Sequence, residues 1–171
     1  MKSEFKLIVL LFVLFAFTAC KEDLPKPPLA LIDPPIPALD MAFASYDIDA
    51  VKGGEVSYIT GTTLKIPANA FVDSAGKPVS GTVQLQYREF HDAVDILLSG
   101  IPMNYDSAGS EGALTTAGMF EVKAMQNNQP LRLADGKNIP IQMASFQTGN
   151  EYNFYTLNEE SRSWEFKGKP T

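Results

Sequence analysis

Apolar and polar side chains alternate along GTVQLQYREF, the stretch from residue 81 to residue 90. In an extended chain the apolar side chains of this stretch would share one face and the polar ones the other: Val83, Leu85 and Tyr87 against Gln84, Gln86 and Arg88. A period of two residues is typical of a β-strand with one buried face, whereas an amphipathic helix needs a period of about 3.6. The stretch therefore predicts a half-buried strand, and no long segment of the chain has the helical period.

Shorter segments with similar alternation occur on both sides of this stretch: EVSYIT, TTLKIP, LTTAGMFEVKAM, IPIQMAS, EYNFYTL and RSWEFK. Leu64 and Ile66 are expected to point into the core, and so are Trp164 and Phe166 near the C-terminus. Each of these segments predicts a further strand.

Turn sequences separate several of the predicted strands. DSAG occurs at Asp73 and again at Asp106, and ADGK begins at Ala134. Aspartate opens a turn by accepting hydrogen bonds from its own backbone, and glycine supplies the positive φ that many turns need. Moderate strands with turns between them predict an all-β chain folded as an antiparallel β-sandwich, Ig-like or related.

The N-terminus has the composition of a targeting segment. Lys2 and Lys6 precede a largely apolar run of 13 residues, 7–19. A helix that crosses a bilayer needs roughly 20 apolar residues, so this run is too short to span one. A basic start and a short apolar core predict a secretory signal peptide instead.

The only cysteine of the chain ends this segment. Thr18-Ala19-Cys20 resembles the lipobox of bacterial lipoproteins, with Phe17 where that motif usually has Leu. The resemblance implies cleavage before Cys20 and covalent acyl chains, palmitate among them, on that residue. The alternative is an ordinary signal peptide with an incidental cysteine.

The residues after the cysteine predict an export signal and a tether. Lys21-Glu22-Asp23 resembles the signal of surface lipoproteins in the Bacteroidota, and the alternative is a solvated charge cluster. Six of the twelve prolines then lie between residues 25 and 37. Proline restricts φ and lacks an N–H, so this stretch is predicted to be a semi-extended spacer.

The chain is therefore predicted to have three parts. Residues 1–19 form the signal peptide, residues 20–44 the lipidated cysteine and Pro-rich linker, and residues 45–171 the β-sandwich domain. Loss of residues 1–19 removes two of the 14 basic and one of the 20 acidic residues, which leaves a net charge of −7. An acidic mature protein is a poor partner for nucleic acid. With Cys20 acylated, no thiol remains for a disulfide, a zinc site or a cysteine nucleophile.

A resemblance covers most of residues 53–168. GTTLKIPANAFVDSAGKPVSGTVQLQY, with its Ile-Pro-Ala-x-Ala-Phe and Asp-x-x-Gly elements, resembles a module of Bacteroidota surface and outer-membrane lipoproteins, and REFHDAVDILLSGIPMNYDSAG and TAGMFEV fit the same group. More remotely, the first part is similar to the β-sandwich domain shared by ankyrins and netrin receptors, with Asn69 where that family has Gly. The resemblance implies a β-sandwich and an envelope location, and it implies no particular activity.

The best candidate for chemistry is EFHDAVD, which holds Glu89, His91, Asp92 and Asp95. A histidine beside carboxylates can bind a metal or form an acid–base pair. On a strand Glu89 and His91 share the face of Tyr87, whereas Asp92 faces away unless the chain bends. The spacing matches no established metal motif, so a strand end followed by a polar turn is the favoured interpretation, with no metal and no cofactor besides the lipid.

Aromatic residues gather near the C-terminus: Tyr152, Phe154, Tyr155 and Trp164. Exposed aromatic rings can stack on sugars, but most large apolar side chains belong to the core. Tyr155, on the opposite face from Phe154, is the one expected to be exposed.

Together these features predict a lipid-anchored, non-enzymatic module of the cell envelope that binds or scaffolds a protein or glycan at the outer membrane. We expect it on the cell surface, with the periplasmic face as the alternative. The alternative function is an accessory glycan-binding protein, or a metal-dependent enzyme subunit that uses Glu89, His91, Asp92 and Asp95.

Overall fold

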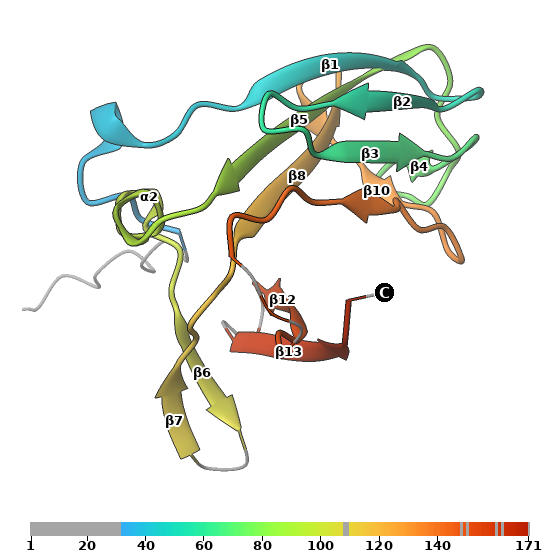
Figure 1. Ribbon diagram of the computed structural model, residues 1–171. Coiled ribbons are helices and arrows are strands. Elements are labelled where there is room, and N and C mark those ends of the chain that lie inside the picture. The colour runs from blue at the N-terminus through green and yellow to red at the C-terminus, as the bar shows by residue number, and fades with distance from the viewer. Residues whose placement is uncertain are drawn as a thin grey trace, which may run out of the picture. The chain divides into compact units, whose positions relative to one another are not determined.

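The computed structural model describes residues 32–107, 110–147, 149, 151–159, 161 and 163–170. Antiparallel strands dominate these residues and pair into the two main sheets of a sandwich-like fold (Figure 1). The prediction of an all-β fold with antiparallel sheets is confirmed.

The larger sheet has the strand order β1-β5-β8-β9. Its strands are β1 (Ala44–Asp49), β5 (Thr82–Phe90), β8 (Met119–Gln126) and β9 (Gln129–Pro130). The alternating stretch that predicts a half-buried strand forms β5, which pairs with β1 on one side and with β8 on the other.

The opposing sheet has the order β11-β3-β2, and a short pair of strands, β4 and β10, lies next to it (Figure 1). These strands are β2 (Gly54–Ser57), β3 (Thr63–Ile66), β11 (Ile141–Gln142), β4 (Phe71–Val72) and β10 (Arg132–Leu133). Two hairpins and two short helices complete the described chain: β6 (Asn104–Ser107) with β7 (Ser110–Ala113), β12 (Phe154–Asn158) with β13 (Ser163–Gly168), the 3-10 helix η1 (Pro37–Leu39) and the α-helix α2 (Ala93–Ser99).

The first core lies between the two sheets and contains inward residues of β1 to β5. The predicted inward residues of β5 and β3 are all in it and are almost completely buried: Val83, Leu85, Tyr87, Leu64 and Ile66. Alternation therefore identifies the inner face of both strands correctly. Before β4 the chain turns at Asn69, which has φ 53°, in the left-handed region that asparagine tolerates better than most residues other than glycine.

The second core lies at the end of β5 and is formed by Phe90, Ile101 and Met119. Trp164 packs against it, and its indole Nε1–H donates a 2.6 Å hydrogen bond to the carbonyl oxygen of Pro102. Trp164 is half-buried and points toward the core, as predicted. Phe166 on the same strand is 60% exposed, so the prediction for that residue is wrong. The second core covers the hairpin at Trp164 but does not extend to Phe166.

The chain before β1 packs on the domain, although residues up to 44 are predicted to be linker. Ile32 and Met41 contact the second core. Arg88, which alternation places on the outer face of β5, is only 3% exposed because this segment covers it. The guanidinium lies 2.7 Å from an Asp40 carboxylate oxygen, and Arg88 Nη1 donates to the Met41 carbonyl oxygen at 2.8 Å. A buried cation needs such partners, and they fix residues 40–41 to the sheet.

Helix α2 is not predicted, because seven residues are too few to show a helical period. It begins after Asp92, whose Oδ1 accepts hydrogen bonds from the backbone N–H groups of Val94 (2.8 Å) and Asp95 (2.9 Å). It ends at Gly100, which has φ 68°. An aspartate N-cap and a left-handed glycine after the last turn are both strong helix-boundary signals, so the sequence carries the boundaries of this helix.

We expect Gly100→Ala to destabilise the protein more than Gly136→Ala. Both glycines have φ near 70°, so the conformational free-energy cost of placing an alanine at positive φ is similar at the two positions. A Cβ at Gly100 would lie 2.2 Å from the Asp33 carbonyl carbon, whereas one at Gly136 meets nothing within 4 Å. The steric contact should add about 1–3 kcal/mol to the loss at Gly100, measured as the free energy of unfolding in urea. Equal losses in the two variants would show that the segment at Asp33 does not pack there.

Candidate functional site

The carboxylate of Glu89 lies at the end of the first core, on the inner face of β5, and its residue is 1% exposed. Its Oε1 accepts a 2.5 Å hydrogen bond from the Tyr87 hydroxyl. Its Oε2 accepts a 2.8 Å hydrogen bond from the Thr60 hydroxyl and lies 2.7 Å from His91 Nε2. As predicted, Glu89 and His91 share the face of Tyr87, because they stand two residues apart along an extended chain.

The hydrogen bonds around Glu89 favour its ionised form. Burial opposes ionisation, but hydrogen bonds from Thr62, Tyr87, His91 and Thr60 outweigh it and lower the pKa of Glu89. Burial, together with the hydrogen bond to this carboxylate, raises the pKa of the Tyr87 hydroxyl. The site is therefore a carboxylate held by hydrogen bonds inside the fold, and Tyr87 keeps its proton.

His91 is directed toward Glu89. Its side chain is 14% exposed, and its ring meets Phe146 edge-on with the ring centroids 4.4 Å apart. The other ring nitrogen, Nδ1, is buried and has no hydrogen-bond partner among the described residues. In this arrangement Nε2 of His91 is in contact with Glu89, and Nδ1 is buried.

The two aspartates of the predicted cluster have other positions. Asp92 uses one carboxylate oxygen to cap α2. Asp95 is half-buried in the first turn of that helix, where burial and then the charge of Asp92 raise its pKa, while His91 opposes the shift. The structure thus brings Glu89 and His91 together and leaves Asp92 and Asp95 on the helix. Within the described ranges, no group of three or more His, Asp, Glu or Cys side chains is placed to hold a metal ion.

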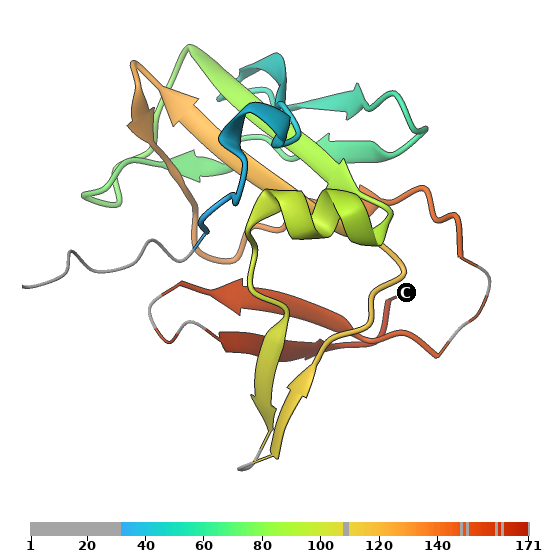
Figure 2. The ribbon, with the colours of Figure 1, turned by 90° about the vertical axis from the view of Figure 1, so that its left-hand side faces the viewer.

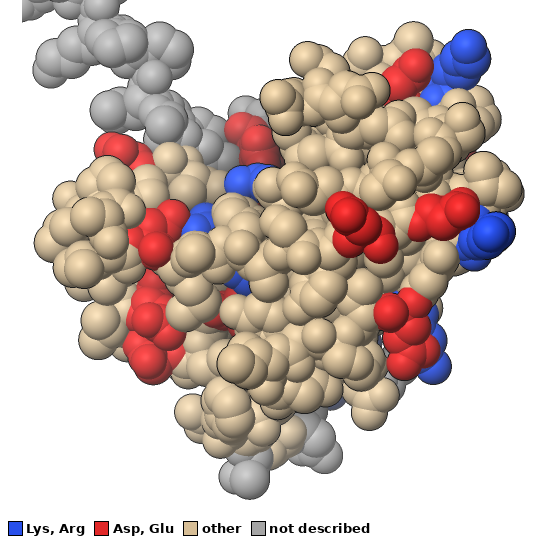
Figure 3. Space-filling model, turned by 90° about the horizontal axis from the view of Figure 1, so that it is seen from above, with Lys and Arg blue, Asp and Glu red and all other residues tan. Residues whose placement is uncertain are grey.

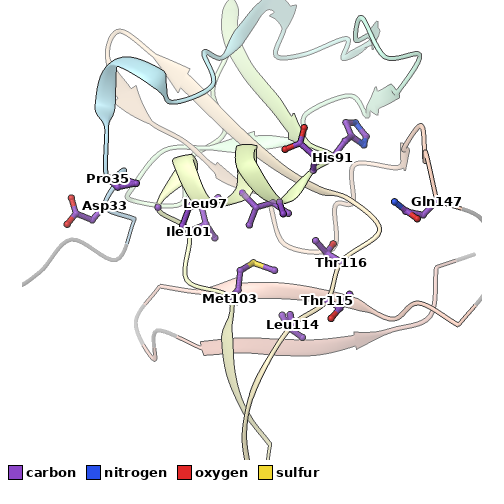
Figure 4. Close-up of a pocket in the computed structure, with 14 residues that line it drawn as sticks. Asp33, Pro35, His91, Leu97, Ile101, Met103, Leu114, Thr115, Thr116 and Gln147 are labelled. Atoms are coloured by element: carbon purple, nitrogen blue, oxygen red, sulfur yellow. The ribbon is translucent and has the colours of Figure 1, made fainter.

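An open groove of about 920 Å³ lies beside α2. Its described lining combines polar side chains with apolar ones, and none of them belongs to Lys or Arg: Asp33, Pro35, His91, Asp92, Ala93, Ile96, Leu97, Gly100, Ile101, Met103, Leu114, Thr115, Thr116 and Gln147. Figure 4 shows Thr115 and Thr116 across the groove from the helix, with Gln147 at one side. Hydroxyl, amide and carboxylate groups over an apolar floor can bind a neutral ligand.

The C-terminal aromatic residues do not form the predicted arrangement. Tyr155 is half-buried, and its ring lies edge-on to Phe166 with the centroids 5.7 Å apart. Phe166 is the more exposed ring of this pair, and Phe154 is 41% exposed and stacks on Phe120. Tyr155 is therefore not the exposed aromatic side chain of the hairpin.

Sequence reasoning missed two groups of residues. Thr60 and Thr62 belong to the turn before β3 and reach Glu89 from 27 or more positions away, so no local pattern reveals them. Val94 and Leu97 on α2 are 63% and 69% exposed. The capping signals of Asp92 and Gly100 would have placed them on a short helix, but not on its outer face.

The predicted lipidation site Cys20 and the predicted export signal Lys21, Glu22 and Asp23 lie outside the described residues. In the part of the chain that the structure describes, no helix has the length and apolar character needed to cross a bilayer. Comparison with protein-family models, with curated proteins and with solved structures finds no match to this chain.

Proposed function

We propose that this protein is a lipid-anchored, non-enzymatic module of the cell envelope that binds or scaffolds another molecule at the outer membrane. The observation that carries the non-enzymatic part is the use of Glu89 and His91 inside the fold. Glu89 is buried among side-chain hydrogen-bond partners, and His91 is one of them. The two residues that the sequence offers as the best catalytic candidates therefore contact each other, and Glu89 also accepts a hydrogen bond from Tyr87 in the core.

The groove beside α2 is the surface that we assign to a ligand. Its mixed lining suits a neutral glycan or a peptide segment. Nucleic acid is not an expected partner, since the chain is acidic and the face seen in Figure 3 has no continuous basic area.

The anchor is proposed from the sequence around Cys20. We expect wild-type protein, expressed in a bacterium of the Bacteroidota fed an alkyne-bearing palmitate analogue, to carry the label and to sediment with outer membranes. Cys20→Ser should lose the label completely, because the acyl chains attach at this residue and the chain has no second cysteine.

A triple alanine variant of Lys21, Glu22 and Asp23 is the matched control, because it keeps the thiol. It should retain the label and lose sensitivity to protease added to intact cells. An unlabelled wild-type protein, or a labelled Cys20→Ser variant, would rule out the anchor.

The alternative, a metal-dependent enzyme subunit, is favoured only by the presence of His91 and Asp92 in the groove lining. We expect purified protein to hold less than one equivalent of transition metal by elemental analysis, with no change in His91→Ala. The variant should be less stable by about 1.5–3 kcal/mol, because the Glu89 carboxylate loses one hydrogen bond. Stoichiometric metal in the wild type that disappears in His91→Ala would establish the alternative.

A further inference from the structure

Four large apolar side chains are exposed at one end of the described domain. Ile36 and Leu39, at the two ends of η1, are 49% and 59% exposed, and Val94 and Leu97 on α2 are 63% and 69% exposed. Figures 1 and 2 show η1 and α2 side by side at this end, and in Figure 2 both are at the front. Single exposed apolar residues are common on proteins, but a group of them marks a contact surface. We call these four side chains the end face.

The exposed side of α2 is apolar, whereas a surface helix usually turns polar residues outward. Val94 and Leu97 stand three residues apart and therefore lie on the same side of the helix. Ile96 packs on the second core and Ser99 is buried, so the inner side of α2 is covered by the domain itself. The apolar outer side of α2 has no covering element among the described residues and is available to contact another surface.

The chain enters the domain beside the end face. Ile32 packs on the second core, and the next residue, Asp33, donates its backbone N–H to the Gly100 carbonyl oxygen at 3.3 Å, directly after α2. Only 11 residues lie between Cys20 and Ile32. Even fully extended, such a segment spans at most about 40 Å. An anchor on Cys20 would therefore hold this end of the domain close to the bilayer, at a high effective concentration.

The charges around the end face identify the kind of surface that it fits. Residues 32–43 and helix α2 contain no Lys or Arg. Asp33, Asp40 and Asp95 lie within these segments, and Asp92 caps the helix. Anionic lipids attract basic segments and repel acidic ones. Contact with a membrane here must therefore be apolar, and it is expected on a zwitterionic surface.

We infer that the end face, made of Ile36, Leu39, Val94 and Leu97, rests on the bilayer that holds the acyl chains of Cys20. The inference rests on the proposed lipid anchor and adds an orientation to it. The end face contacts the lipid interface, and Leu97, which also lines the groove, places the groove opening next to the membrane. The opposite end, which includes the β1–β2 turn, points away from the bilayer.

The test uses the acylated full-length protein with one added thiol. Acylation consumes Cys20, so Val94→Cys supplies the only thiol that can react with an environment-sensitive fluorophore. Val51→Cys is the matched control, because Val51 is also an exposed valine (48%) and lies in the β1–β2 turn at the other end of the domain (Figure 1). Wild-type protein should take no label.

Each labelled protein is reconstituted into phosphatidylcholine vesicles, and flotation first shows that it is attached. We expect fluorescence at position 94 to rise several-fold and shift to the blue relative to position 51, and a spin label on the lipid acyl chains to quench position 94 only. Addition of anionic lipid should reduce the effect. Leu39→Cys gives a second probe of the same surface if Val94→Cys folds poorly.

Three results would overturn the inference. Protein that floats but has equal, water-like fluorescence at positions 94 and 51 would leave the anchor intact and refute the membrane contact alone. Protein that does not float would refute the anchor and the contact together. Shielding of position 94 that depends on protein density, without quenching from the lipid, would assign the end face to a second copy of the chain.

Discussion

Glu89→Gln should lower the free energy of unfolding by about 3 kcal/mol or more, because hydrogen bonds to a buried charged group contribute about 1.5–3 kcal/mol each. Tyr87, Thr60 and His91 all direct a polar atom at this carboxylate. The glutamine side chain has the same size but only one acceptor oxygen, whereas the carboxylate has two. Its NH₂ group would face hydrogen-bond donors and could not accept from them. Urea unfolding followed by the fluorescence of Trp164, the only tryptophan of the chain and a neighbour of the second core, measures the loss.

Glu55→Gln is the matched control for this substitution. Glu55 makes a 3.9 Å ion pair with Lys65, and both side chains are more than half exposed. Exposed pairs contribute about 0–1 kcal/mol, so the unfolding curve of this variant should nearly superimpose on that of the wild type. Equal curves for Glu89→Gln and wild type would show that the buried network does not support the fold.

The same carboxylate gives a pH dependence with a defined sign. The pKa of Glu89 is lower in the folded protein than its value of about 4.3 in unfolded chains, so the native state binds fewer protons there. The stabilisation is fully present above the unfolded pKa and is lost as the pH falls through the folded pKa. The wild type should therefore lose stability below about pH 4.3 more steeply than Glu89→Gln does.

Arg88→Ala should destabilise the protein by about 3–5 kcal/mol, because its removal leaves the half-buried Asp40 carboxylate without the counter-ion that it has in the wild type. Arg88 is held by Asp40 and Glu121, each at 2.7 Å, and its guanidinium lies over the ring of Phe43. Its loss should also release the segment around Asp40 from β5. Urea unfolding gives the stability, and the rate of proteolysis between residues 32 and 43 reports the release.

Two further variants make the Arg88 result specific. Arg88→Lys should recover only part of the loss, because an ammonium cannot contact both carboxylates with the planar geometry of a guanidinium. Arg132 is exposed, and its guanidinium donates a long 3.5 Å hydrogen bond to the Ser74 carbonyl oxygen. Arg132→Ala should therefore change the free energy of unfolding by less than about 0.5 kcal/mol. An Arg88→Ala protein as stable and as protease-resistant as Arg132→Ala would contradict the role of Arg88.

These contacts matter for the proposed anchor, because they lie on the part of the chain that leads to it. The segment is held at Asp33 by Gly100 and at Asp40 by Arg88. The chain therefore packs on the domain from residue 32 onward, earlier than the predicted boundary at residue 45. A shorter tether narrows the set of orientations that the domain can take at a membrane.

Local alternation was enough to predict which side chains of β3 and β5 face inward. Side chains in a strand point to opposite faces in turn, so the identity of the inner face is a local property of the sequence. For the same reason the sequence correctly placed Glu89 and His91 on the face of Tyr87. It also carried the signals of the short helix, in Asp92 and Gly100, although the absence of a helical period concealed them.

The tertiary structure alone decided what covers each face. Arg88 points outward from the sandwich as alternation predicts, yet it is buried because residues 40–43 fold over it. Phe166 alternates like Trp164, yet it is exposed because the second core ends before it. Glu89 has a structural role because the fold brings the Thr60 hydroxyl, 29 residues away in the sequence, within hydrogen-bond distance of its carboxylate. The backbone geometry of one segment sets the period of its side chains. Burial and hydrogen bonding depend instead on the other segments that pack against it, and the period gives no information about those segments.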